Sequence, residues 1–134
     1  MSRENVELVR SICAAWERGD YSSADWADPE IDFVIADGPS PGRWSGHAGM
    51  AEGWRAWLGA WEDFQQQAEG YRDLDGERVL VLFRFKGIGK TSGLDLAKMH
   101  PLGTGLFHVR GGKVTRFVGY TQRERALADL GLRE

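Results

Sequence analysis

Cysteine is nearly absent from this sequence, since Cys13 is the only one among 134 residues. A single thiol cannot form an internal disulfide, so we expect a reducing compartment, the cytoplasm. The three histidines, His47, His100 and His108, are far apart in the sequence, whereas metal-binding motifs bring ligands together at short spacings. The sequence also lacks a glycine-rich dinucleotide motif and a phosphate-binding loop. We therefore expect no metal and no cofactor.

Long apolar runs and clusters of basic residues are missing as well. No stretch approaches the roughly 20 apolar residues that span a bilayer, and the start, "MSRENVELVRSICAAWERGD", lacks the apolar core of a signal peptide. The formal net charge is -3 with no block of Lys and Arg, which argues against nucleic acid and membrane partners. The length and the 42% hydrophobic content are those of one soluble globular domain, residues 1–134.

Aromatic residues, in contrast, are abundant, with six tryptophans and six phenylalanines. These large, rigid side chains build cores and interfaces, and they can also line the cavity of an apolar ligand. The composition leaves both interpretations open.

The spacing of apolar residues predicts three helices in the first half of the chain. Steps of three and four over residues 5–18 indicate a helix that ends at Gly19. Asp20 is placed to cap a short second helix that runs to Ala27. The alternating segment "IDFVIAD" follows as a strand, and a third helix is predicted over residues 47–63.

The second half of the chain reads as strands. We predict an edge strand over residues 65–74, a hairpin turn at 75–76 and a long strand over 77–90. A further pair of strands meets at the Gly-Gly turn of residues 111–112, and a short helix follows the last strand. Helices followed by strands indicate an α+β fold with helices against one face of a bent sheet.

Five segments follow one another along the chain in an order that is typical of one family: "AWERGD", "ADPEIDF", "WSGHAGMAEGWRAWLGAWEDF", "GERVLVLFRFKGIGKTSG" and "VRGGKVTRFVGYTQRERAL". Together they resemble the SnoaL-like branch of the nuclear transport factor 2-like superfamily. The resemblance implies a cone of curved mixed, mostly antiparallel β-sheet wrapped around about three N-terminal helices, with an open end suited to a small molecule. It also implies a homodimer through the outer sheet face. The same cone hosts many chemistries and non-enzymes, so the fold does not set the function.

The ketosteroid isomerases among these relatives provide a chemical test. Their reaction needs a carboxylate base, with a tyrosine and a protonated aspartic acid around the substrate oxygen. Transferring these positions by their motifs places Ile12, Phe33 and Thr104 there. None of the three supplies the required group, so isomerase chemistry by this route is not expected, although the cavity can remain.

The same alignment predicts that His108 faces the cavity. If Thr104 points inward, alternation along a strand places Leu106 and His108 inward too. A histidine in an apolar wall can act as an acid or a base near neutral pH. The alternative is a hydrogen-bonded side chain without chemistry.

The neighbouring residues of opposite parity are then assigned to the outer face of the sheet. They are Phe107 and Val109, and Phe117 joins them on the next strand. Together they would expose an apolar patch that a dimer partner could cover.

Two further polar residues are candidates for the site. Asp37 follows the strand face that carries Phe33, and it either looks into the mouth of the cone or stabilises an Asp-Gly turn. Tyr120 either donates its hydroxyl to a ligand or is buried with a protein partner. The predicted ligand-binding wall consists of Ile12, Trp16, Phe33, Trp44, Trp57, Thr104 and Leu106.

The sequence supports two functions. The first is a binding module for a small apolar molecule, which the loss of the isomerase groups favours. The second is a cofactor-free enzyme of the isomerase, cyclase, hydratase or hydrolase type, with His108, Asp37 and Tyr120 as catalytic candidates. A cavity in which these side chains converge on one point would favour the enzyme.

Overall fold

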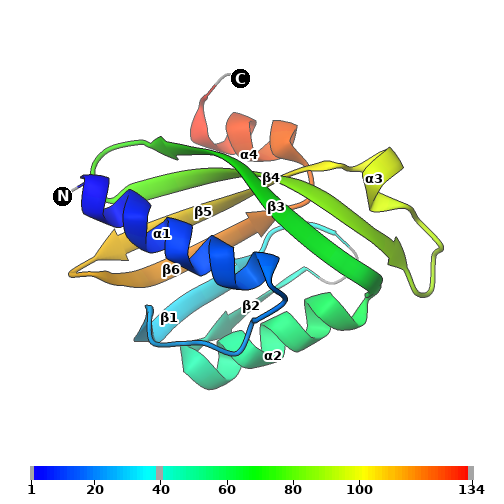
Figure 1. Cartoon of the computed structure of the whole chain (residues 1–134), viewed down its shortest axis with the longest axis horizontal. Helices are drawn as coiled ribbons and strands as arrows, with labels where there is room; N and C mark the ends of the chain where they lie inside the picture. The colour runs from blue at the N-terminus through cyan, green and yellow to red at the C-terminus, as the bar shows by residue number, and fades with distance from the viewer. Residues whose placement is uncertain (1, 39–40, 133–134) are drawn as a thin grey trace.

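A computed structural model of the chain describes residues 2–38 and 41–132. Its elements are α1 (Ser2–Glu17), β1 (Ala27–Ile35), β2 (Gly42–Ser45), α2 (Gly46–Gly59), β3 (Trp61–Asp73), β4 (Arg78–Gly89), α3 (Leu96–Met99), β5 (Leu102–Arg110), β6 (Lys113–Tyr120) and α4 (Arg123–Leu130). The strands form one sheet in the order β2-β1-β6-β5-β4-β3 (Figure 1). The β1–β6 pair is parallel and the other pairs are antiparallel. The predicted α+β fold with a mixed, mostly antiparallel sheet is confirmed.

The short second helix is not formed, so two helices rather than three lie in the N-terminal half. The Asp20 carboxylate accepts hydrogen bonds from the Ser22 backbone N–H at 3.0 Å and from the Ser22 hydroxyl at 2.7 Å. This local turn competes with a helix for the same side chain. The segment up to Ala27 is therefore an irregular connection to β1.

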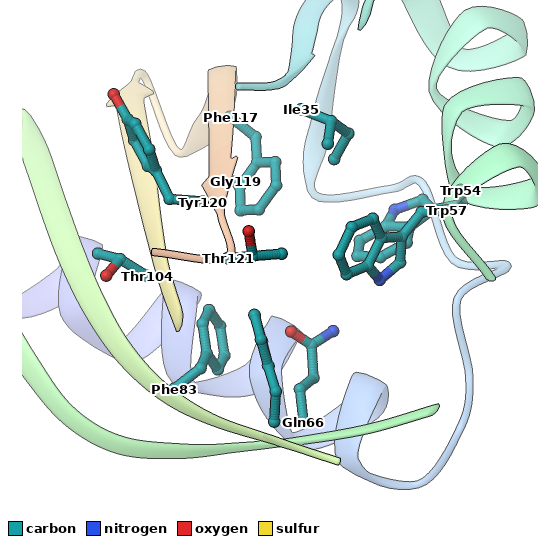
Figure 2. A pocket seen from close by; sticks show the side chains of 11 residues that line it. Ile35, Trp54, Trp57, Gln66, Phe83, Thr104, Phe117, Gly119, Tyr120 and Thr121 are labelled. Carbon is teal, nitrogen blue, oxygen red and sulfur yellow. The ribbon is translucent and has the colours of Figure 1, made fainter. Parts of the chain in front are cut away.

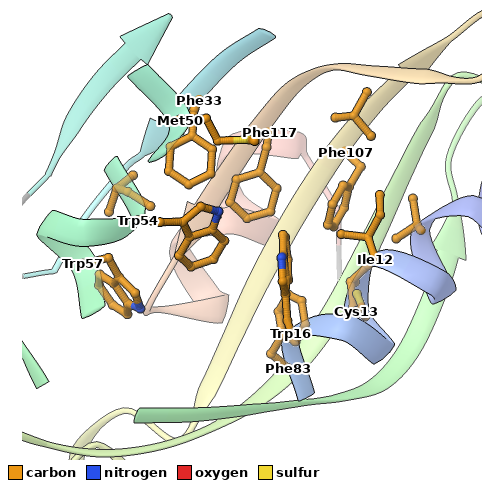
Figure 3. Packing of buried hydrophobic residues seen from close by; sticks show 14 of the residues in the cluster. Ile12, Cys13, Trp16, Phe33, Met50, Trp54, Trp57, Phe83, Phe107 and Phe117 are labelled. Atoms are coloured by element: carbon orange, nitrogen blue, oxygen red, sulfur yellow. The ribbon is translucent and has the colours of Figure 1, made fainter. Parts of the chain in front are cut away.

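The inner face of the sheet packs against α1 and α2 around a cluster of aromatic rings (Figure 3). Trp16 of α1 lies at its centre, with its ring centroid 4.9 Å from Trp54, 5.7 Å from Phe107 and 5.5 Å from Phe117. Aromatic pairs at such distances add stabilisation beyond the area that they bury. Much of the space inside the cone is therefore filled by the protein's own rings.

Two glycines on the inner face of β5 make room for these rings. A Cβ built on Gly103 would lie 2.0 Å from the Phe85 ring, and one on Gly105 would lie 2.9 Å from the Phe83 ring. A side chain at either position would displace a phenylalanine. On its inner face, β5 therefore has no side chains at Gly103 and Gly105, and its first inward side chain is that of Phe107.

A second, smaller core covers part of the outer face. Leu80, Leu106 and Val118 pack there against Ala126 and Leu127 of α4. These three strand residues lie side by side on β4, β5 and β6. The C-terminal helix thus shields the middle of the outer face.

The predicted assignment of β5 and β6 side chains to the two faces is wrong. Phe107, Val109 and Phe117 belong to the inner core, whereas Leu106 lies on the outer face under α4. A register error of one residue reverses every side chain of a strand.

The error began with the inward placement of Thr104, because alternation along β5 then carried it to Leu106 and His108. In β6, Thr115 is an extra residue, since His108 pairs with Arg116 whereas Val109 pairs with Val114. The apolar patch proposed for a dimer is buried within the chain, while homodimerisation itself stays a prediction. Within the described residues, none of the helices has the length and apolar character to cross a membrane.

Candidate functional site

An apolar cavity lies between α2 and the inner face of the sheet, where β1 and β6 end (Figure 2). Its walls are mainly Ile35, Trp54, Trp57, Phe83, Phe85 and Phe117. The volume is about 20 Å³, which is enough for about one water molecule. The cavity is therefore a narrow slot between aromatic rings.

Two polar side chains interrupt the aromatic wall. Gln66 of β3 is buried and its Nε2 donates to the Tyr21 hydroxyl at 3.2 Å. Thr121 follows β6 and is also buried. Figure 2 shows the ends of both side chains pointing into the space that faces Trp57. The Thr121 methyl faces Trp57, while its hydroxyl donates to Asp37.

Asp37 fixes the position of Thr121 through hydrogen bonds on the side away from the cavity. The Asp37 Oδ1 accepts hydrogen bonds from the Thr121 backbone N–H at 2.6 Å and from its hydroxyl at 2.7 Å. The two residues meet because β1 and β6 are parallel neighbours and end at the same edge. The Asp37 Oδ2 is buried and has no hydrogen-bond partner among the described residues. A buried carboxylate oxygen without a partner is uncommon, because desolvation is costly.

Gly38, the residue after Asp37, packs closely against the ring of Trp57. Gly38 adopts a positive φ of 95°, and a Cβ there would lie 3.0 Å from the Trp57 ring and 3.4 Å from Thr121. Asp37, Gly38, Thr121 and Trp57 therefore form one packed unit at the end of the cavity.

Tyr120 and Thr104 contribute to the cavity wall but not through their polar ends. Both residues line the cavity, while Figure 2 shows their side chains pointing away from it. The Tyr120 hydroxyl donates to Asp129 Oδ2 of α4 at 3.1 Å. Burial, followed by the Asp129 carboxylate, raises the pKa of Tyr120. Its hydroxyl thus has a protein partner, and the inward direction predicted for Thr104 is wrong.

His108 lies on the outer face, so its predicted place in the cavity is wrong. It is paired with Arg78 on β4 and with Arg116 on β6. Partial burial lowers the pKa of His108, and the charges of Arg116 and Arg78 lower it further. The residue shares no wall with Asp37 or Thr121. Tyr120 also lies on the outer face, but the apolar row of Leu106 and Val118 separates it from His108. The three predicted catalytic side chains therefore do not converge on one point.

The remaining predicted wall residues are mostly core. Ile12, Trp16 and Phe33 are buried in the inner cluster, and Trp44 packs on Phe33 at a ring distance of 6.3 Å. Leu106 faces α4. Among the predicted ligand-binding residues, only Trp57 presents its side chain to the cavity.

Several side chains that face the slot were not predicted from the sequence. Trp54 is one helical turn before Trp57, and Phe83 and Phe85 alternate along β4. The alternation of Phe83 and Phe85 was readable from the sequence. Gln66 and Thr121 were not, because the burial of a single polar residue depends on what the fold places over it.

A second, open hollow of about 320 Å³ lies beside the cavity. Its walls come from His100, Pro101 and Leu102 around the start of β5 and from Gln122 and Arg123 at the start of α4. Thr121 lines both this hollow and the aromatic slot. Within residues 2–38 and 41–132, no group of three His, Cys, Asp or Glu side chains is arranged to hold a metal ion.

Comparison with known proteins gives a family and a fold. The family model described as SnoaL-like domain matches residues 9–117. Comparison with curated proteins gives no match.

Several solved structures share the fold. An NTF2-like protein of unknown function from Burkholderia pseudomallei K96243 is 17% identical, with a TM-score of 0.73 over 93% of this chain and 95% of that one. TerC co-crystallized with polyporic acid is 21% identical, with a TM-score of 0.69 over 95% and 97%. A putative polyketide cyclase from Xanthomonas campestris pv. campestris is 20% identical, with a TM-score of 0.66 over 95% and 96%.

Proposed function

This chain belongs to the SnoaL-like family, and from that premise we propose that it binds one small, flat, mostly apolar molecule that carries a hydrogen-bonding oxygen. The observation that carries the proposal is the slot between α2 and the sheet, with aromatic walls and one amide side chain, Gln66, pointing into it. Small-molecule sites commonly combine an apolar wall with a few placed polar groups. An aromatic ring fits between aromatic walls, and an oxygen on it can pair with the Gln66 amide.

The closed slot must open to admit such a molecule. Ligand pockets of proteins hold roughly 300–1,000 Å³, whereas this cavity holds about 20 Å³. Trp57 is the residue whose displacement gains the most room, because its ring seals the slot against Gly38 and Thr121. The fold accepts organic ligands elsewhere, as TerC was co-crystallized with polyporic acid and another relative of the same fold was solved in complex with trimethylamine.

Thermal protection by a matched pair of probes tests this proposal. We expect 2-naphthol to raise the melting temperature saturably, because a ligand that binds only the folded state stabilises it. The variant Gln66→Leu keeps the size of the side chain and removes its amide. It should weaken 2-naphthol binding and leave naphthalene binding unchanged. Absence of protection by both probes at their solubility limits would contradict the proposal.

A second candidate function is cofactor-free proton transfer of the isomerase, cyclase or hydratase type, with Asp37 rather than His108 as the base. The specific observation is the Asp37 carboxylate, which has one oxygen fixed by Thr121 and the other buried without a partner among the described residues. Asp37 lies behind Thr121 and not on the cavity wall, so this candidate requires Thr121 to move before the carboxylate can abstract a proton. On a substrate found by screening, Asp37→Asn should abolish turnover while ligand binding persists. Turnover that survives this substitution would remove the enzyme candidate.

Location and assembly extend the same proposal. The single buried cysteine supports a reducing, cytoplasmic setting. Burial raises the pKa of the Cys13 thiol to about 12, so it is an unreactive core side chain. We also propose that the protein forms a homodimer. Phe107, Val109 and Phe117 are not part of the proposed interface, because they are buried in the inner core.

A further inference from the structure

Gln66 is the one buried member of three successive glutamines in β3. Gln65 and Gln67 are exposed, whereas Gln66 is only 6% exposed. Alternation along the strand turns Gln66 inward, and it pairs there with Phe85 of β4, which also lines the cavity. Burial of an amide is costly unless its polar atoms have partners. The cost at Gln66 therefore depends on what each end of its amide contacts.

The nitrogen end of this amide has a protein partner outside the cavity wall. The Gln66 Nε2 donates to the Tyr21 hydroxyl at 3.2 Å. Tyr21 follows α1, and its ring centroid lies 6.1 Å from that of Trp16 and 4.6 Å from that of Trp54. These ring contacts fix the position of the hydroxyl, and the hydroxyl in turn holds the nitrogen of Gln66.

The oxygen end of the amide is left for the cavity. Among the described residues, no donor reaches the Gln66 Oε1, and Figure 2 shows the end of this side chain pointing into the slot. The Thr121 hydroxyl donates to Asp37 instead. The Trp54 indole N–H is unpaired as well, but Figure 3 shows it turned toward the Phe117 ring. The Gln66 oxygen is thus an unused acceptor within an aromatic wall.

We infer that the slot selects an aromatic ligand that carries a hydrogen-bond donor, either a hydroxyl or a ring N–H, over one that carries only an acceptor at the same place. The donor of the ligand pairs with the Gln66 Oε1, and Tyr21 is the positioning residue that keeps this oxygen turned toward the ligand. A ligand acceptor would instead meet the lone pairs of the oxygen, and both groups would stay unpaired. The inference rests on the proposed function and narrows its ligand class.

Two pairs of probes of matched shape test this selection by equilibrium dialysis at neutral pH. Indole offers a ring N–H where benzofuran has an oxygen, and quinoline offers a lone pair where naphthalene has a C–H group. Indole should bind about fivefold or more tightly than benzofuran, as expected for one added hydrogen bond between neutral groups. Gln66→Leu should abolish this difference and leave the ratio of quinoline to naphthalene binding unchanged, because the indole N–H groups of the cavity wall remain in the variant.

The positioning role of Tyr21 has its own readout. Tyr21→Phe keeps the stacked ring and removes the hydroxyl, so the amide is free to rotate by half a turn and present its N–H groups. Quinoline should then gain over naphthalene relative to the original chain. Tyr71→Phe is the matched control, because Tyr71 is a half-buried tyrosine outside the cavity wall, with the Arg10 Cζ 4.4 Å from its ring centroid. It should change neither ratio.

The outcomes separate this inference from the function on which it rests. If none of the four probes binds, the proposed function is contradicted and the inference falls with it. If the probes bind but indole shows no advantage over benzofuran, the inference alone is overturned. Equal ratios in Tyr21→Phe and Tyr71→Phe would remove the positioning role of Tyr21. The order of the probes in the original chain decides the selection even if a variant fails to fold.

Discussion

The carboxylate of Asp37 accepts two hydrogen bonds from Thr121, a residue 84 positions later in the chain, through its backbone N–H at 2.6 Å and its hydroxyl at 2.7 Å. Since β1 and β6 are parallel neighbours in the sheet, this contact links the two chain segments just past the ends of these strands, beside the aromatic slot. The same contact turns the Thr121 hydroxyl toward Asp37 and its methyl toward Trp57.

The first prediction concerns this contact. Thr121→Val removes the hydroxyl bond and should lower the free energy of unfolding by about 1–3 kcal/mol, and Asp37→Ala should cost more because both bonds are lost. Urea unfolding measures both. Thr91→Val is the control, since Thr91 is exposed and should change stability by less than about 0.5 kcal/mol. Equal effects for Thr121 and Thr91 would show that the contact contributes nothing to stability.

A second prediction follows from the smooth inner face of β5. Gly103→Ala places a Cβ 2.0 Å from the Phe85 ring and should destabilise the fold by about 1–3 kcal/mol through overpacking. Gly70→Ala in β3 is a matched control, because its nearest neighbour would lie at 3.8 Å. Chemical denaturation of the two variants should separate them clearly. A Gly103 variant as stable as the Gly70 variant would mean that Phe85 can move at no cost.

The third prediction is a pH dependence of stability. The pKa of folded His108 is below its ordinary value of 6.5, so the unfolded chain binds the proton more readily than the folded chain. The His108 contribution is therefore complete above about pH 6.5 and is lost as pH falls through that value toward the folded pKa. Urea midpoints between pH 5 and 8 should fall less steeply toward acid in His108→Gln than in the original chain. Parallel profiles would contradict this sign or the role of His108 in it.

The fourth prediction concerns Trp57 as the seal of the slot. Trp57→Ala should cost about 3–5 kcal/mol and leave a larger apolar cavity, which naphthalene can fill with a rise in melting temperature. Trp44→Ala provides the comparison, because Trp44 packs on Phe33 outside the slot. Its loss should destabilise the protein without rescue by naphthalene. Rescue of both variants, or of neither, would remove Trp57 from this role.

Much of the fold could be predicted from local patterns. The long strand that became β4, the Asp75–Gly76 turn and the Gly111–Gly112 turn are where the sequence places them. A period of two or 3.6 and a glycine with positive φ are properties of a short segment, so the segment alone reveals them. The failed helix after Asp20 shows the limit, because one carboxylate can cap a helix or close a turn.

The candidate site depended on contacts that short segments do not contain. The sequence determined that β5 alternates, but only the tertiary structure decided that Phe107 faces inward and His108 outward, because Phe107 packs against Trp16 of α1 and Leu106 packs under α4. The sequence determined an acidic residue after β1, while the parallel pairing with β6 brought Thr121 to it. Side-chain direction and long-range pairing follow from how whole elements bury their apolar faces, and that choice is made only when the sheet is assembled.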